Sequence, residues 1–369
     1  MFLVAIIVVF GYVYRDLFHW AMLCLMDLVP WYHVPGDAYE AFSSSWTHMG
    51  LGNYDSLGPG DFIIMSVLTS LFGGNAAMAQ RIFWLSIMPL SAITMRILLG
   101  RITSSNIAKL IIPFVYAVNG ITIVWFQIGA YAFFPAFVLF PLLMLYLIKI
   151  LEEKERRLLH MLIFTFIYGL MSNWLLYALL YFFPFVAVFF LVEIIFRRDW
   201  KYTGKTSLLF MGSFGIHFLL VAPVGFDQLL NIVGFYTESP GTFGYYTPTP
   251  MEQLLEDVRR AFSWEYTENM ITNLTYLLGI SAIGALFIKH RTSLKYYLSL
   301  LLIATLIILF ARLVNMGLIM NWFTYFPILL TFQHPGKLAM MAAWSFFLMM
   351  AILINEVEGR IALSHKATL

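Results

Sequence analysis

Residues 15–80 form a polar, acidic segment directly after the first hydrophobic run of the chain. Asp27 stands in an Asp-Leu-Val-Pro element, and Asp37 follows Pro35-Gly36. Carboxylates and the imidazole of His33 can bind divalent cations, but no spacing in this segment is diagnostic of a metal site. We therefore predict no metal site, while a divalent cation stays open as a cofactor. The segment carries one base, Arg15, against six acids: Asp16, Asp27, Asp37, Glu40, Asp55 and Asp61.

Both named aspartates also have a structural interpretation. Asp27 could serve as a turn or N-cap carboxylate, and Asp37, at the head of an expected helix, is more typical of a helix cap. Trp31 and Trp46 in the same segment are candidates for sugar or lipid contacts. A lone tryptophan near a membrane is usually an interfacial anchor, so both interpretations stand.

Two later segments offer further binding groups. Tyr245-Tyr246 end a glycine-, proline- and aromatic-rich loop, which suits stacking on sugar faces and suits the membrane interface equally. Arg259-Arg260 could hold a phosphate or meet lipid head groups. His334 and Lys337 precede the last apolar run and would meet an anionic phosphate, unless Lys337 only extends to the interface.

These side chains must be positioned by membrane helices. The 369-residue chain is 61% hydrophobic and only 11% charged, with a mean hydropathy of +0.82, which predicts an all-α, polytopic membrane protein. One cysteine, Cys24, excludes an internal disulfide and a cysteine metal cage. Runs long enough to cross a ~30 Å hydrocarbon core predict about ten spans. They lie near 2–14, 81–99, 109–126, 129–148, 159–171, 174–196, 206–224, 271–288, 295–312 and 337–355.

The positions of the basic residues predict the orientation of these spans. Residues 62–72 are too short to cross and are expected to form an interfacial or re-entrant helix. With them left out, most bases fall on one set of alternate loops, so both termini are predicted to be cytoplasmic. The predicted inner bases are Arg101, Lys109, Lys149, Lys154, Arg156, Arg157, Arg197, Arg198, Lys201, Lys205, Lys289, Arg291, Lys295, Arg360 and Lys366.

The predicted organisation is one transmembrane domain, 1–369, with three outer segments. These are a first outer loop with interfacial helices at 15–80, a second at 225–270, and a re-entrant segment at 313–336. The spans hold almost no ionisable groups away from their ends and show no internal repeat, which argues against a channel or secondary transporter. Any chemistry is expected at the outer face.

Several motifs resemble the GT-C superfamily of membrane glycosyltransferases, and in particular its arabinofuranosyltransferase-like and YfhO-like branch. One span is followed by a long acidic outer loop with Asp-Leu-Val, Trp46 and a Gly-Pro element. Ala79-Gln80-Arg81-Ile82-Phe83-Trp84 then opens the next span, which continues with Pro89-Leu90-Ser91-Ala92-Ile93-Thr94-Met95. The late Phe332-Gln333-His334-Pro335-Gly336-Lys337 is similar to a Phe-Arg-x-Pro-x-Lys element of that branch.

The resemblance implies an inverting transfer of a sugar from a polyprenyl-phosphate donor to a glycan, lipid or protein acceptor. It implies an acid of the first outer loop as general base, a position that Asp27 matches best and for which Asp37 competes. Arg81 falls within the motif and joins the expected substrate-binding residues. The resemblance also favours the plasma membrane of an archaeon or bacterium, with an endoplasmic reticulum location as the alternative.

Two features depart from the family pattern. Gln333 stands where relatives tend to have Arg, and the chain ends shortly after its last span, without the large outer carbohydrate-binding region of some relatives. The alternative function is noncatalytic: a flippase for lipid-linked sugars, or a YfhO-like accessory protein in glycan assembly. A flippase would need a continuous polar path through the spans, which this sequence lacks.

Overall fold

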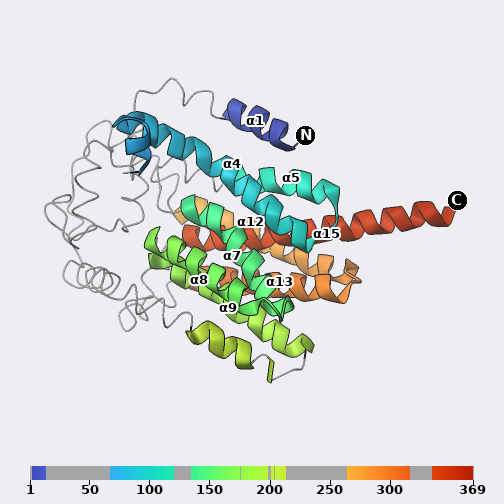
Figure 1. Ribbon diagram of the computed structural model, residues 1–369. Coiled ribbons are helices and arrows are strands. Elements are labelled where there is room, and N and C mark those ends of the chain that lie inside the picture. Colours follow the sequence, from blue (N-terminus) through green and yellow to red (C-terminus); the bar gives the residue numbers. More distant parts are fainter. Residues whose placement is uncertain are drawn as a thin grey trace. The chain divides into compact units, whose positions relative to one another are not determined.

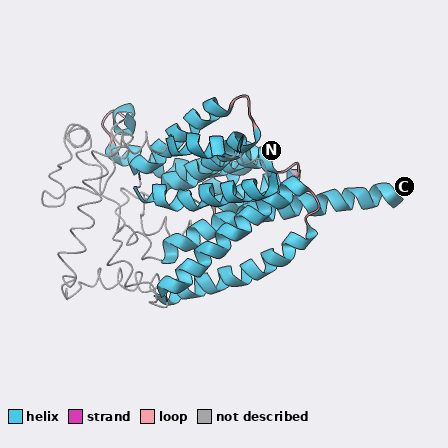
Figure 2. Cartoon of the chain, turned by 90° about the horizontal axis from the view of Figure 1, so that it is seen from below, coloured by secondary structure: helices cyan, strands magenta, loops and turns pink. Residues whose placement is uncertain are grey.

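The computed structural model describes residues 2–13, 67–119, 134–174, 176–197, 201–202, 204–212, 264–315 and 335–368. Within these ranges every regular element is helical and no strand occurs, as Figure 2 shows. Short helical stretches also lie at 67–71 and within 201–212. The labelled helices of Figure 1 are α1 (Phe2–Val13), α4 (Ala76–Ile102), α5 (Asn106–Ala117), α7 (Phe134–Glu152), α8 (Arg157–Trp174), α9 (Leu176–Arg197), α12 (Trp264–Gly284), α13 (Arg291–Asn315) and α15 (Pro335–Thr368).

The helices agree with a protein of the membrane. Among the described residues, three helical stretches are long and apolar enough to cross a bilayer: Arg81–Ile102, Arg291–Leu313 and Met341–Ile361. Shorter apolar helices lie at Asn106–Ala117, Arg157–Leu170, Pro184–Phe196 and Ile271–Phe287. The prediction of an all-α membrane protein is confirmed at this level, and the count of about ten spans stays a prediction.

The start of α4 is defined by local chemistry. Gly73 and Gly74 adopt φ values of +63° and +84°, a region that glycine enters without steric cost, and they end the short helix at 67–71. The side chain of Asn75 then accepts a hydrogen bond from the Met78 amide at 3.0 Å, which caps the new helix. The hydropathy pattern predicts the end of the 62–72 run at this glycine pair, and the described part of that run ends there.

The helices group into two compact units, each described by itself. The first comprises 1–183, 199–220 and 357–369, and the second comprises 184–198 and 221–356. In the first unit α1 packs on α4 and α5 through Ile6, Phe10, Met88, Ala92 and Ala117. A second aromatic cluster joins α7, α8, the start of α9 and the 204–212 helix through Phe140, Phe164, Phe182 and Phe210.

The core of the second unit lies where α12, α13 and α15 approach closely. Tyr297 of α13 is fully buried, and its hydroxyl donates to the carbonyl of Ser281 in the last turn of α12 at 2.7 Å. A Cβ atom added to Gly284 would lie 2.7 Å from that hydroxyl oxygen and 3.0 Å from Leu353 Cδ1 of α15. A side chain at this position would require the Tyr297 hydroxyl and Leu353 to shift, and small residues are common where membrane helices pack tightly.

Two prolines inside helices are matched by donors from other helices. Pro113 of α5 has no N–H with which to bond the Lys109 carbonyl, and Arg96 of α4 donates Nη1–H to that carbonyl at 2.8 Å. Pro141 of α7 likewise cannot donate to the Phe137 carbonyl, which accepts a hydrogen bond from the Tyr116 hydroxyl of α5 instead. A backbone carbonyl that is shielded from water needs such a donor from the protein.

Candidate functional site

Most residues that the sequence suggests for the outer site lie outside the described residues. The catalytic candidates are Asp27 and Asp37, and both fall there. The same holds for the binding candidates Trp31, His33, Trp46, Tyr245, Tyr246, Arg259, Arg260 and His334. Their roles stay predictions, as do the three outer segments as a whole.

Arg81 and Lys337 are the two predicted binding residues within the described part. Arg81 lies in the second turn of α4, five residues after its first residue, Ala76, and its side chain is partly buried. Lys337 lies in the first turn of α15, which begins at Pro335. Proline is well suited to the first position of a helix, because an N–H there would have no helical partner. Of the motifs of the GT-C resemblance, Ala79–Trp84 thus lies near the start of α4 and Lys337 near the start of α15, while Pro89–Met95 lies in the middle of α4.

Arg312 lies at the C-terminal end of α13 and contacts α12. Its Nη2–H donates to the Thr272 hydroxyl at 2.9 Å, within the second unit. Sequence reasoning does not find Thr272, because a lone threonine in an apolar run gives no signal. The bond joins the last turn of α13 to the N-terminal half of α12.

In the first unit an ionic cluster joins the C-terminal ends of α4 and α7 to the start of α8. Arg101 Nη2 lies 2.7 Å from Glu152 and 3.1 Å from Glu153. The buried His160 donates Nε2–H to Glu153 at 2.7 Å. This hydrogen bond lowers the pKa of the Glu153 carboxyl below its usual value, and the nearby charges of Arg101 and Lys149 lower it further. The ionic groups of the cluster bond one another, which fits a structural role.

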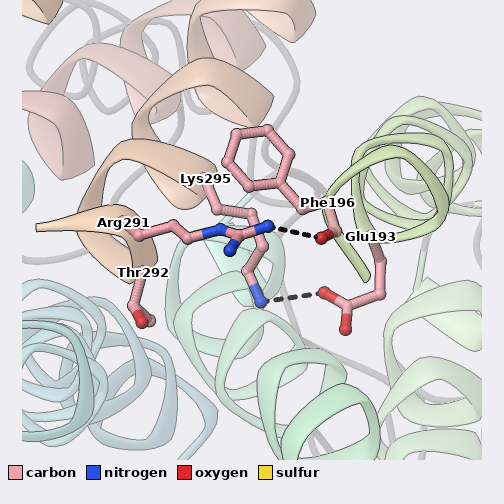
Figure 3. A pocket seen from close by; sticks show the side chains of 5 residues that line it. All are labelled: Glu193, Phe196, Arg291, Thr292 and Lys295. Carbon is pink, nitrogen blue, oxygen red and sulfur yellow. Dashed lines mark hydrogen bonds and ion pairs between the residues drawn. The ribbon is translucent and has the colours of Figure 1, made fainter. Parts of the chain in front are cut away.

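The second unit holds a polar cavity of about 190 Å³ between α9 and α13, shown in Figure 3. It is lined by Glu193 and Phe196 of α9 and by Arg291, Thr292 and Lys295 of α13. Lys295 Nζ lies 2.8 Å from Glu193 Oε2, and the Glu193 side chain is only 4% exposed. Arg291 donates Nη2–H to the Phe196 carbonyl in the last turn of α9 at 2.9 Å.

Sequence reasoning missed this cavity. Glu193 does leave a signal, since it is an acid within the apolar run 174–196. Its partner is 102 residues away, and no local pattern links the two positions. The sequence predicts Arg291 and Lys295 only as inner-loop bases. Among the residues that the structure describes, no group of three His, Cys, Asp or Glu side chains gathers as a metal site would require.

Comparisons with known proteins reveal a likeness in structure but none in sequence. No protein-family model and no curated protein sequence matches the chain significantly. Among solved structures, the chain is similar to the archaeal oligosaccharyltransferase AglB from Archaeoglobus fulgidus, solved in complex with an inhibitory peptide and a dolichol-phosphate. The TM-score is 0.49 and the identity 13%, over 99% of this chain and 51% of that one. The chain thus spans about half the length of that structure.

Proposed function

We propose that this chain is a membrane glycosyltransferase of GT-C type with about ten spans. It transfers a sugar from a polyprenyl-phosphate donor to a glycan, lipid or protein acceptor, with inversion at the anomeric carbon. Asp27 is the general base that takes the proton from the acceptor hydroxyl, and Asp37 is the competing candidate. The reaction takes place at the outer face of the membrane, and both termini are cytoplasmic.

The observation that carries the proposal is the position of Arg81. It lies near the start of the long apolar helix α4, whose other end holds Arg101 in an ionic cluster. A cation near the end of an apolar helix lies at head-group depth, where the phosphate of a lipid-linked donor would be. The Ala79–Trp84 element of the GT-C resemblance contains this residue.

Two further features support the same function. Lys337 lies in the first turn of α15, within the second element of the resemblance, and would meet the same class of anionic group. Glu152 pairs with Arg101 in the first unit, and Glu193 pairs with Lys295 in the second. Because these two carboxylates already bond to bases, we assign the general base to the acidic segment 15–80.

The test is sugar transfer by the purified protein in lipid, supplied with a mixed set of polyprenyl-phosphate sugars. The variants are Asp27→Asn and Asp37→Asn, with Asp61→Asn as a matched control from the same acidic segment. Loss of a general base should lower turnover by about 10²–10⁴-fold in Asp27→Asn and leave Asp61→Asn close to the native rate.

The other outcomes are equally informative. If turnover is lost in Asp37→Asn alone, the chain is still a transferase, and Asp37 rather than Asp27 is the general base. An absence of turnover with every donor, together with clear binding of the lipid-linked sugar, would overturn the transferase. The alternative of a carrier or a YfhO-like accessory protein would then take its place.

A further inference from the structure

The cavity between α9 and α13 carries a charge balance that selects a class of ligand. Arg291 and Lys295 contribute two positive charges to its lining, and Glu193 contributes one negative charge. Because Lys295 is paired with Glu193 at 2.8 Å, the uncompensated charge is that of Arg291. The lining therefore favours a ligand with a single negative charge.

The hydrogen-bonding groups of the lining suit phosphate oxygens. Arg291 uses Nη2–H for the Phe196 carbonyl, which is one of the five N–H donors of a guanidinium group. The Thr292 hydroxyl lines the same cavity and can donate one more bond. Arginine with a nearby hydroxyl is a common arrangement for phosphate recognition. The cavity holds a volume of about six water molecules at ~30 Å³ each, which is enough for a phosphodiester with a small substituent.

The surroundings of the cavity favour a lipid as the source of this phosphate. Leu191 and Ile195 of α9 are two residues from Glu193 and so lie on other faces of the helix than the cavity, and they are 49% and 60% exposed. In a membrane protein such apolar side chains face acyl chains. The cavity also lies at the start of α13, whose first residue is Arg291 and which Lys289 shortly precedes. The positions of the basic residues predict that this end faces the cytoplasmic head groups.

We propose that this cavity binds a phosphodiester monoanion, with the head group of a membrane phospholipid as its natural source. Arg291 and Thr292 bind the phosphate oxygens, and the Glu193–Lys295 pair forms the neutral wall of the site. The proposal holds whether or not the chain transfers sugars, since none of these residues belongs to the outer site.

The test is titration of the delipidated protein in detergent with phosphatidylglycerol, followed by native mass spectrometry. Arg291→Gln should weaken the tightest bound lipid by at least about tenfold, the loss expected for a charge-assisted hydrogen bond. Arg156→Gln is the matched control, because it removes one exposed base from the same predicted side of the membrane without touching the cavity. Glu193→Gln removes the negative charge from the cavity and should tighten binding several-fold.

The outcomes separate the possible ligands. If millimolar glycerophosphoglycerol displaces the lipid, a soluble phosphodiester suffices; if it does not, the acyl chains contribute and the lipid is the source. Equal affinities in Arg291→Gln and Arg156→Gln would overturn the proposal. Weaker binding in Glu193→Gln would also overturn it, since the cavity would then prefer a cationic group. Should Arg291→Gln prove unstable by its thermal midpoint, Arg291→Lys keeps the charge but loses the planar set of donors. An affinity below those of the native chain and of Arg156→Gln would then support the proposal, and an equal affinity would overturn it.

Discussion

The hydroxyl of Tyr116 donates a hydrogen bond of 2.7 Å to the carbonyl of Phe137, the carbonyl that Pro141 leaves without a helical donor. Tyr116 is fully buried in α5, and Phe137 lies in α7. Tyr116 of α5 thus supplies the hydrogen bond that the backbone of α7 lacks at Pro141, and this bond also links the two helices.

This relationship predicts a rescue. Tyr116→Phe should lower the free energy of unfolding by about 1–3 kcal/mol, because a buried carbonyl loses its partner. Pro141→Ala restores the N–H of residue 141, so Tyr116→Phe should cost distinctly less in the double variant. A double-mutant cycle of unfolding in mixed detergent micelles measures the difference. If Tyr116→Phe costs the same stability in the native chain and in Pro141→Ala, the hydrogen bond of Tyr116 does not compensate for the proline.

The buried ion pair of the second unit should respond unequally to its two partners. Lys295→Met removes the ammonium group that pairs with the nearly buried Glu193 carboxylate and should destabilise by about 3–5 kcal/mol. Glu193→Gln should cost less, because glutamine still accepts a hydrogen bond from Lys295, whose charge is partly solvated. The double variant Glu193→Leu, Lys295→Met should recover most of the loss. Thermal midpoints in detergent decide this, and a double variant as unstable as Lys295→Met would contradict it.

Glu153 predicts a pH dependence with a definite sign. Its folded-state pKa lies below its usual value of 4.5, because His160 donates a hydrogen bond to its carboxylate and Arg101 and Lys149 add favourable charge. The ionised carboxylate therefore stabilises the fold above about pH 4.5, and this contribution disappears as the pH falls through the lowered pKa. The native chain should exceed Glu153→Gln in stability by about 1 kcal/mol or less at pH 7, since the group is partly exposed. This difference in stability between the native chain and Glu153→Gln should shrink as the pH is lowered. A difference that grows on acidification would contradict the stabilising role of the ionised Glu153.

Two glycines of α12 should respond in opposite ways to the same substitution. Gly284→Ala would press a methyl group against the Tyr297 hydroxyl and Leu353, at a cost of about 1–3 kcal/mol. Gly279→Ala meets no atom within 4 Å and should be neutral or stabilising by up to about 1 kcal/mol, the gain expected in a helix. Thermal unfolding of the two variants side by side tests this. Similar shifts would show that the packing at Gly284 is not restrictive.

The predicted orientation can be tested with the single cysteine. Cys24 belongs to the predicted outer segment, so a membrane-impermeant maleimide should label it in intact cells. Glu155→Cys, made in a Cys24→Ser background, places the thiol in the exposed turn between α7 and α8. It should be labelled only after the membrane is opened. The reverse pattern would invert the topology and move the proposed active face to the cytoplasm.

The sequence predicted the helices better than their ends. The apolar run 81–99 marked α4, but the helix begins at Ala76, because Asn75 supplies a cap that hydropathy does not register. The predicted spans 159–171 and 174–196 divide slightly early, because α8 extends to Trp174 and α9 begins at Leu176. Hydropathy follows burial in lipid, whereas helix ends depend on single hydrogen bonds.

The contacts between helices could not have been predicted from the sequence. Glu193 and Lys295 form a pair across 102 residues, and the partners of Pro113 and Pro141 come from other helices. Periodicity locates one face of one helix and says nothing about which helix covers it. For the outer site, Arg81 is predicted because it belongs to a motif, and its role stays a prediction, as do those of Asp27 and Asp37.

The two prolines matched by outside donors have a consequence for the way this sequence can diverge. A chain that loses Pro113 no longer needs Arg96, and a chain that loses Pro141 no longer needs the hydroxyl of Tyr116. If Arg96 or Tyr116 were lost before its proline, the carbonyl of Lys109 or Phe137 would lose this hydrogen bond. Among homologues we therefore expect each proline and its donor to disappear in that order, which would appear as covariation between positions 113 and 96 and between positions 141 and 116.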